Sequence, residues 1–240
     1  MIHKSLSRLE SASLEYIFSE RRDGDMRTLS PRQRLFQSIN FPLQSVIYSQ
    51  QIHGATVLEV KKSQQGQTIP NVDGIFYTNT LRPGEQIALA ILTADCVPIL
   101  TYETRSGVIG VAHSGWKGTL KNISSTLIEM FLSHGLKVND IRVVIGPHIG
   151  VCCYSVPEER GKKFQQEYGN QAIQVREKSN YLDLGFIISQ QLQKKGIEER
   201  HIENINICTA CNNNRFFSFR QDSLETFGEQ LGVLTLSRYN

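Results

Sequence analysis

Three side chains that can bind a metal ion occur where apolar segments of the sequence end. His53 follows QQI, Cys96 stands in TADCVPIL, and His113 stands in VAHSGWKG. Two imidazole nitrogens and one thiolate suit Zn²⁺, and three protein ligands leave a fourth tetrahedral position for water. Because an ion in such an open site lowers the pKa of its bound water to roughly 7, we expect a catalytic ion.

Spacing alone does not enforce this site, because the three residues are far apart and no HExxH or paired CxxC arrangement joins them. A histidine at a strand end is usually packed or hydrogen-bonded, so each residue taken singly has that simpler interpretation. Three such placements favour a shared site, since ligands bind where the strands of an α/β sheet stop. Two other interpretations stay open: Cys96 as a nucleophile activated by His113 without metal, and a purely structural ion in an interaction protein.

The segment HSGWKG predicts an anion site beside His113. A helix that starts just after Gly118 directs its free N–H groups and its positive dipole end toward the end of the preceding strand. Lys117 adds charge, and Gly115 permits a close backbone approach. Taken in isolation, the same motif is a glycine turn with a solvated lysine.

Five cysteines are present, an odd number that predicts no dense disulfide framework. Cys208 and Cys211 form a CxxC motif, but a structural zinc site needs a second pair, and the only other pair, Cys152 and Cys153, is adjacent. We therefore expect these four to be buried thiols, with the two pairs in distant segments.

The elements that must position these residues follow from apolar runs separated by turns. Residues 45–60 and 72–79 predict three short strands, 87–103 a buried strand interrupted at Asp95 and Cys96, and 107–113 another. A helix is expected from Gly118 to Gly135, with further helices near 158–168 and, capped by Asp183, near 184–195. INICTAC and RFFSFR predict a last pair of strands. The alternation predicts one mixed α/β domain over residues 1–240, with a central mixed sheet flanked by helices.

Composition excludes several classes of function. The 26 basic and 23 acidic residues leave a net charge of +3, too small a surplus for nucleic-acid binding. The first residues lack the apolar core of a signal peptide, and no segment approaches a transmembrane span, so membrane association is not expected. We expect a protein of the reducing cytoplasm.

Six motifs occur in an order that resembles the YfiH family, also called the multicopper polyphenol oxidase or laccase-domain family. They cover roughly 51–220 and are QIHGATV, DGIFYTN, TADCVPIL, GVAHSGWKGTL, IGPHIGVCCYSV and CTACNNNRFFSFR. The resemblance implies a mixed α/β fold with a metal ion on His53, Cys96 and His113. Family members are described as purine nucleoside phosphorylases that also deaminate adenosine and cleave methylthioadenosine, as copper-dependent phenol oxidases, or as enzymes that correct peptidoglycan precursors.

These implications favour a zinc-dependent purine nucleoside phosphorylase acting on adenosine, inosine, guanosine and methylthioadenosine, with adenosine deaminase activity. Alternatives are an amidohydrolase that edits peptidoglycan precursors and a copper-dependent laccase, although a laccase needs several Cu²⁺ ions held by many histidines and the chain has six. Phosphate is expected at Gly115, Lys117 and Arg220, and Asp73 or Asp95 is expected to orient a ligand or move a proton. The chain departs from the family pattern after Arg220, where a second arginine and a later Gly-Arg pair are missing.

Overall fold

The computed structural model of the protein describes residues 1–9 and 12–239 and has the expected mixed α/β fold. It resolves the predicted sheet into two six-stranded sheets and one three-stranded sheet. Among the described residues, no helix is both long and apolar enough to cross a membrane.

The first six-stranded sheet has the order β1-β2-β15-β7-β3-β5. Its central strand pairs are antiparallel, whereas β3 runs parallel to both β7 and β5. The strands span Ile2–Leu9 (β1), Ala12–Phe18 (β2), Gln230–Arg238 (β15), Gln86–Thr93 (β7), Val46–Ser49 (β3) and Thr68–Ile69 (β5).

The second six-stranded sheet has the order β14-β10-β8-β9-β6-β4. Its two outer pairs are parallel, and the inner pairs are antiparallel. The strands span Ile202–Asn204 (β14), Ile141–Ile145 (β10), Val97–Glu103 (β8), Ile109–Ser114 (β9), Gly74–Tyr77 (β6) and Val57–Glu59 (β4).

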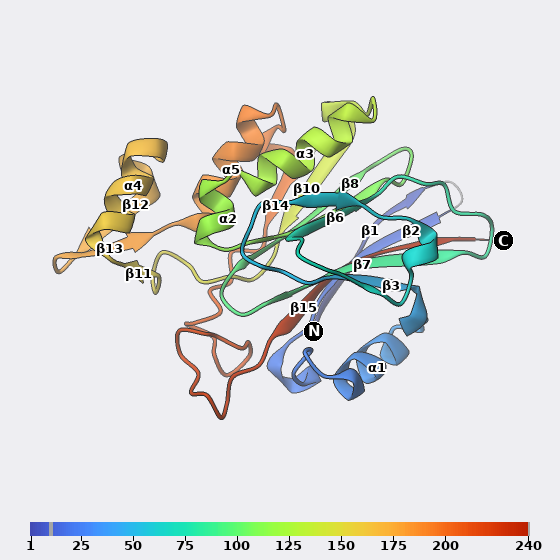
Figure 1. Cartoon of the computed structure of the whole chain (residues 1–240), viewed down its shortest axis with the longest axis horizontal. Helices are drawn as coiled ribbons and strands as arrows, with labels where there is room; N and C mark the ends of the chain where they lie inside the picture. Colours follow the sequence, from blue (N-terminus) through green and yellow to red (C-terminus); the bar gives the residue numbers. More distant parts are fainter. Residues whose placement is uncertain (10–11, 240) are drawn as a thin grey trace.

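The two large sheets lie face to face between two helical layers (Figure 1). On β7, Leu89 and Ile91 point into the core between the sheets, whereas Ala88 and Ala90 face α1 (Leu29–Ser38). The outer face of the second sheet is covered by α2 (Trp116–Leu120), α3 (Ile123–Ser133) and α5 (Leu184–Lys194). Because successive strand residues point to opposite faces, each continuously apolar strand contributes side chains to two hydrophobic cores, one on either face of its sheet.

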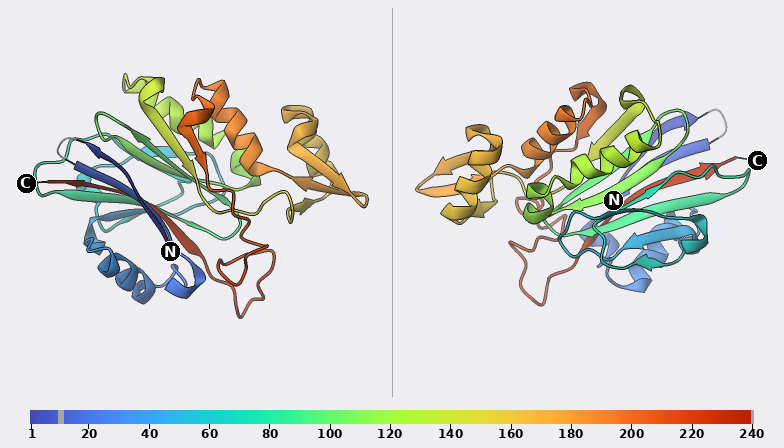
Figure 2. Two further views of the ribbon diagram at one scale, coloured as in Figure 1. Left: turned by 180° about the vertical axis from the view of Figure 1, so that it is seen from behind. Right: turned by 45° about the horizontal axis from the view of Figure 1, so that its top comes forward.

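A smaller unit projects from one end of the molecule (Figure 2). It consists of the sheet β11-β13-β12 and α4 (Glu158–Tyr168). Its strands span Ser155–Val156 (β11), Ser179–Leu182 (β13) and Ile173–Arg176 (β12). The chain enters α5 from this unit, and Asp183 caps that helix as predicted by accepting a hydrogen bond from the Phe186 N–H at 2.9 Å.

Two local predictions were wrong. The helix expected after Gly118 is broken at Asn122, whose left-handed backbone separates α2 from α3. INICTAC and RFFSFR, expected as a last pair of strands, both lie in a long loop, residues 205–229, that leads to β15. Its backbone N–H groups bind side chains instead of a neighbouring strand: that of Phe217 donates to Gln230 at 2.9 Å and that of Arg220 to Asp95 at 2.8 Å.

Candidate active site

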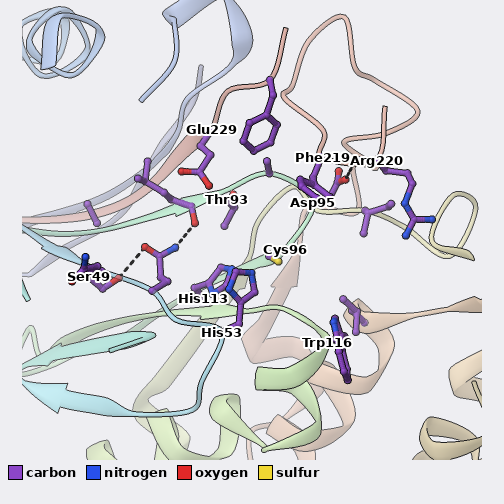
Figure 3. A pocket seen from close by; sticks show the side chains of 18 of the residues that line it. Ser49, His53, Thr93, Asp95, Cys96, His113, Trp116, Phe219, Arg220 and Glu229 are labelled. Atoms are coloured by element: carbon purple, nitrogen blue, oxygen red, sulfur yellow. Dashed lines mark hydrogen bonds between the residues drawn. The ribbon is translucent and has the colours of Figure 1, made fainter. Parts of the chain in front are cut away.

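His53, Cys96 and His113 meet because of how the strands before and after them are paired. β3 runs parallel to β7, so the segments that carry His53 and Cys96 leave the first sheet at the same end. In the second sheet Pro98 pairs with His113, which places the end of β9 beside the start of β8. One potential ligand atom of each of the three lies within 4.8 Å of those of the others. Figure 3 shows the two imidazoles next to the Cys96 sulfur, with ring centroids 4.9 Å apart.

Asp73 orients two of these three residues from a fully buried position just before β6. Its Oδ1 accepts a hydrogen bond from His113 Nδ1 at 3.0 Å. Its Oδ2 accepts from the N–H of Gly54 at 2.7 Å and of Ile52 at 3.2 Å, the two neighbours of His53. Since Nδ1 of His113 faces the carboxylate, Nε2 is the nitrogen available to a metal, a common arrangement for a ligating histidine.

The ionised forms of Cys96, His113 and Asp73 stabilise one another. Burial raises the pKa of the Cys96 thiol, but the positive charge of His113 and hydrogen bonds from both histidines outweigh this and lower it to about 7. Burial disfavours the His113 imidazolium, but the Cys96 thiolate and the Asp73 carboxylate raise its pKa to about 10. Burial also opposes ionisation of Asp73, whose pKa nevertheless falls below its usual range because His113 and backbone N–H groups bind the carboxylate.

Gly115 lies against this group, where a side chain would not fit. A Cβ atom there would stand 3.0 Å from Cys96 Sγ and 3.2 Å from His53 Cδ2. Gly115 was expected to let an anion approach the backbone. In the structure its missing side chain lets the backbone between β9 and α2 pack closely against Cys96 and His53.

The donor set of two imidazoles and one thiolate fits a single divalent ion. In a tetrahedral zinc site, Zn–N bonds of about 2.0 Å and a Zn–S bond of about 2.3 Å place the ligand atoms roughly 3.3–3.5 Å apart. In this structure the corresponding atoms lie within 4.8 Å of one another, so the side chains must move closer together to bind one ion. They can thus hold a metal ion, with a hydrogen-bonded carboxylate behind one ligand.

Asp95 precedes Cys96 in the chain, and its carboxylate binds groups of the 205–229 loop rather than a potential metal ligand. Its backbone has a φ of 80°, and its carboxylate accepts from Thr209 Oγ1 at 2.6 Å, Ser218 Oγ at 3.0 Å and the Arg220 N–H at 2.8 Å. Burial raises its pKa despite these bonds. Because both oxygens are engaged, Asp95 positions the 205–229 loop over the metal-capable group.

These residues open into a pocket of about 750 Å³, within the range of small-molecule sites. Trp116 and Arg220 lie on one side of the histidines, and Ser49 lies on the other (Figure 3). The Tyr48 hydroxyl, also lining the pocket, is buried without a hydrogen-bond partner among the described residues.

The positive charge of the pocket comes from arginines. Arg220 lines the pocket as expected, and its guanidinium donates to the carbonyl and hydroxyl oxygens of Ser155 at 3.1 and 3.0 Å. Arg160, which sequence reasoning missed, lines the same side with its guanidinium carbon 4.1 Å from the centroid of a Trp116 ring. No local motif marks Arg160, since it belongs to the charged helix α4 of the projecting unit.

Lys117 does not line this pocket, contrary to expectation. Its side chain is exposed, and its ammonium lies 5.6 Å from the Trp116 ring centroid. The reason is the orientation of the one-turn helix α2: Gly118 packs inward, where a Cβ would stand 3.0 Å from the Gly54 carbonyl oxygen, so Lys117 is turned outward.

Glu229 is a further pocket residue that the sequence did not indicate. Burial raises the pKa of its carboxyl group, and the positive charge of Arg27 only partly offsets this. It comes immediately before β15, in a segment without a recognisable motif.

The placement expected for the other cysteines was wrong. Cys152, Cys153, Cys208 and Cys211 form a second group of potential ligands within 4.8 Å of one another, and Cys152 and Cys211 are exposed. Of the four remaining histidines, His148 is buried with Nδ1 2.8 Å from the Gly146 carbonyl oxygen, and His3 and His134 contact Glu15 and Glu59. Nδ1 of His201 is buried without a hydrogen-bond partner among the described residues.

Known proteins share this fold. The crystal structure of YlmD from Geobacillus stearothermophilus matches with a TM-score of 0.81 at 28% identity, over 97% of this chain and 93% of that one. The protein named purine nucleoside phosphorylase YlmD from that species is 34% identical over 213 residues, 83% of this chain and 76% of the relative.

Two further relatives carry names with an activity. Purine nucleoside phosphorylase LACC1 of Mus musculus is 30% identical over 237 residues, 97% of this chain and 53% of that protein, so the chain spans about half its length. A protein of an unknown prokaryotic organism named adenosine deaminase RL5 is 27% identical over 207 residues, 83% of this chain and 78% of its own. Residues 5–237 match the family described as multi-copper polyphenol oxidoreductase laccase, and the chain therefore belongs to this family, which the sequence motifs had indicated.

Proposed function

We propose that the protein is a zinc-dependent purine nucleoside phosphorylase that also deaminates adenosine. The observation that carries the proposal is that one pocket of about 750 Å³ holds both the His53, Cys96 and His113 group and the guanidinium groups of Arg160 and Arg220. The first offers a metal site and the second an anion site, and the volume suits a nucleoside with phosphate beside it. The names of the relatives support a reaction of this class.

Each part of the reaction has residues suited to it. When bound, zinc supplies Lewis-acid polarisation of an oxygen. In phosphorolysis a phosphate oxygen attacks the ribose carbon, and the bond to the purine nitrogen breaks with the electron pair leaving on the base. Arg160 and Arg220 bind the phosphate through charge-assisted hydrogen bonds, for which the planar guanidinium is well shaped.

The departing base needs a proton, and Glu229 is suited to donate it. Its carboxyl group lines the pocket with a raised pKa, so it holds a proton at higher pH than an exposed glutamate does. Asp73 and Asp95 are less suited because their oxygens are occupied by the hydrogen bonds described above. The two aspartates act as positioning residues in this scheme.

The side chains that contact the base are expected to be aromatic. Trp116 and the 74% exposed Phe219 lie at the pocket and present ring faces for a purine. The unpartnered Tyr48 hydroxyl offers a polar group for one edge of the substrate. The five free thiols fit a reducing compartment, and we place the reaction in the cytoplasm.

Phenol oxidation, suggested by the family's description, fits the donor set less well. A multicopper centre needs several ions with multiple histidine ligands. Among the described residues, only His53 and His113 come together in a metal-capable group.

The test measures base release from inosine at varied phosphate, and ammonia release from adenosine, for variants of one arginine at a time. A charge-assisted hydrogen bond contributes about 1.5–3 kcal/mol, so Arg220→Ala or Arg160→Ala is expected to raise the KM for phosphate by roughly ten- to a hundredfold. Lys117→Ala is the matched control, because it removes a nearby positive charge outside the pocket. Deamination, which needs no phosphate, should be largely kept in both variants.

Two results contradict the proposal. The first is base release from inosine that does not depend on phosphate. The second is an equal loss of phosphate use in Lys117→Ala and in the arginine variants, since it would show that only the overall charge of this face matters.

A further inference from the structure

A group of four cysteines lies at the surface, away from the pocket. Cys152 and Cys153 belong to the loop that follows β10, and Cys208 and Cys211 belong to the loop that follows β14. β10 and β14 are parallel neighbours, with Val143 paired to Ile202. Both loops therefore leave the sheet at the same end, which brings together residues nearly sixty positions apart in sequence.

The distances between the four sulfurs suit one tetrahedral ion. Zn–S bonds of about 2.3 Å in a regular tetrahedron place the sulfurs about 3.8 Å apart. Here all four sulfurs lie within 4.8 Å of one another, and Cys211 Sγ is 3.3 Å from the sulfurs of both Cys152 and Cys153. An iron–sulfur cluster distributes its cysteines over different irons and so spreads the sulfurs farther apart.

The backbone around Cys208 favours a thiolate. The N–H groups of Gly150 and Cys211 donate to its sulfur at 3.3 and 3.4 Å. These two donors stabilise a negative charge on the Cys208 sulfur, the charge that a metal-bound thiolate carries.

We propose that Cys152, Cys153, Cys208 and Cys211 bind one Zn²⁺ ion as a closed tetrathiolate site, distinct from the site at His53. On binding, each thiol that is still protonated releases its proton to solvent, and four Zn–S bonds form without any change of oxidation state. All four ligand positions come from the protein, so the ion is structural. The inference stands apart from the proposed function, because none of the four cysteines is among the described residues that line the pocket.

The ion would hold the long loop over the pocket. Thr209, between the two cysteines of the CxxC motif, donates to Asp95 at 2.6 Å, and Asp95 precedes Cys96 in the chain. The neighbouring backbone is joined to His148, with the Thr209 N–H donating to the His148 carbonyl oxygen at 3.0 Å. Zinc bound here thus ties the 205–229 loop to the loop after β10 close to the point where Asp95 holds it.

Elemental analysis of the full chain, purified without chelator under mild reduction, tests the proposal. The wild type should contain about two zinc ions per chain and Cys96→Ser about one. Cys208→Ser/Cys211→Ser should lose one ion relative to the wild type. Co²⁺ loaded into Cys96→Ser should show the strong thiolate-to-metal absorption of four sulfur ligands, which the double variant should lack.

A measurement on the wild type covers the case in which the double variant does not fold. Titration with an organic mercurial, with a chromogenic chelator present, should release about two zinc ions from the wild type and about one from Cys96→Ser. The proposal is overturned if Cys96→Ser contains no zinc after reconstitution with the metal. It is also overturned if alkylation of the denatured, unreduced protein modifies fewer than all five cysteines, since a disulfide would then join members of the group. A wild type with only one zinc ion per chain, retained in Cys96→Ser and absent from the double variant, would support this site and contradict the one at His53.

Discussion

Replacement of Asp73 by asparagine should weaken zinc binding at His53, Cys96 and His113 without unfolding the protein. Asp73 uses one oxygen for His113 and the other for the N–H groups that flank His53. An asparagine side chain has a single acceptor oxygen. If that oxygen stays with the backbone N–H groups, the amide NH₂ faces His113 Nδ1 and favours the tautomer with the proton on Nε2, the nitrogen needed by the metal.

The magnitude follows from that conflict. Loss of a hydrogen-bonding partner behind a metal ligand typically lowers metal affinity by about 10- to 100-fold. That factor corresponds to about 1.4–2.7 kcal/mol. Because Asp73 supports two of the three ligands, we expect the upper half of this range.

Competition between the protein and a chromogenic chelator gives the zinc affinity. The measurement is made on protein that also carries Cys208→Ser/Cys211→Ser, so that only the site at His53 binds zinc. Asp183→Asn is the matched control, because it makes the same chemical change at a helix cap whose only described partner is the Phe186 N–H. Unchanged zinc affinity in Asp73→Asn, or an equal loss in Asp183→Asn, would refute the assignment of Asp73 as the residue that orients the ligands.

Three further outcomes follow from the same geometry. Gly115→Ala places a methyl group 3.0 Å from Cys96 Sγ. Because overpacking costs about 1–3 kcal/mol, chelator competition should show a zinc affinity lower by roughly 5- to 150-fold. Unchanged affinity would contradict the close packing. In the metal-free protein the pKa of His113 is raised to about 10 and that of Cys96 lowered to about 7, so His113 holds a proton that metal must displace. Between these two pH values zinc affinity at this site should therefore rise about tenfold per pH unit, and calorimetry in buffers of different ionisation enthalpy should detect one released proton; no release would show that the histidine is neutral. Thr209→Val removes the hydroxyl that donates to the buried Asp95 at 2.6 Å. This should lower the free energy of unfolding by about 1–3 kcal/mol in denaturant titrations. A change below the error of the titration would mean that water replaces the hydroxyl.

Local sequence signals predicted elements whose formation depends on nearby residues. The apolar runs correctly predicted β7, β8 and β9, and Asp183 correctly predicted the start of α5. The N-terminal strands, α1 and β15 were missed. Burial alternates in the first part of β2, and only Pro31, Leu35 and Phe36 are buried in α1, so both have weak patterns. β15, in contrast, is buried continuously over its first seven residues. RFFSFR has the composition of a strand, but buried side chains from other parts of the chain bind its N–H groups.

The sequence by itself determined the family and the residue types of the site, because six ordered motifs and the positions of His53, Cys96 and His113 are local properties of the chain. Tertiary structure decided which of these residues meet. Lys117 is turned to solvent by the packing of α2, and Arg160 enters the pocket from a separate unit. The four cysteines come together because β10 and β14 run parallel, a pairing between strands that no local pattern specifies. Contacts of this kind depend on strand order and direction, which the cores on both faces of the sheets select together.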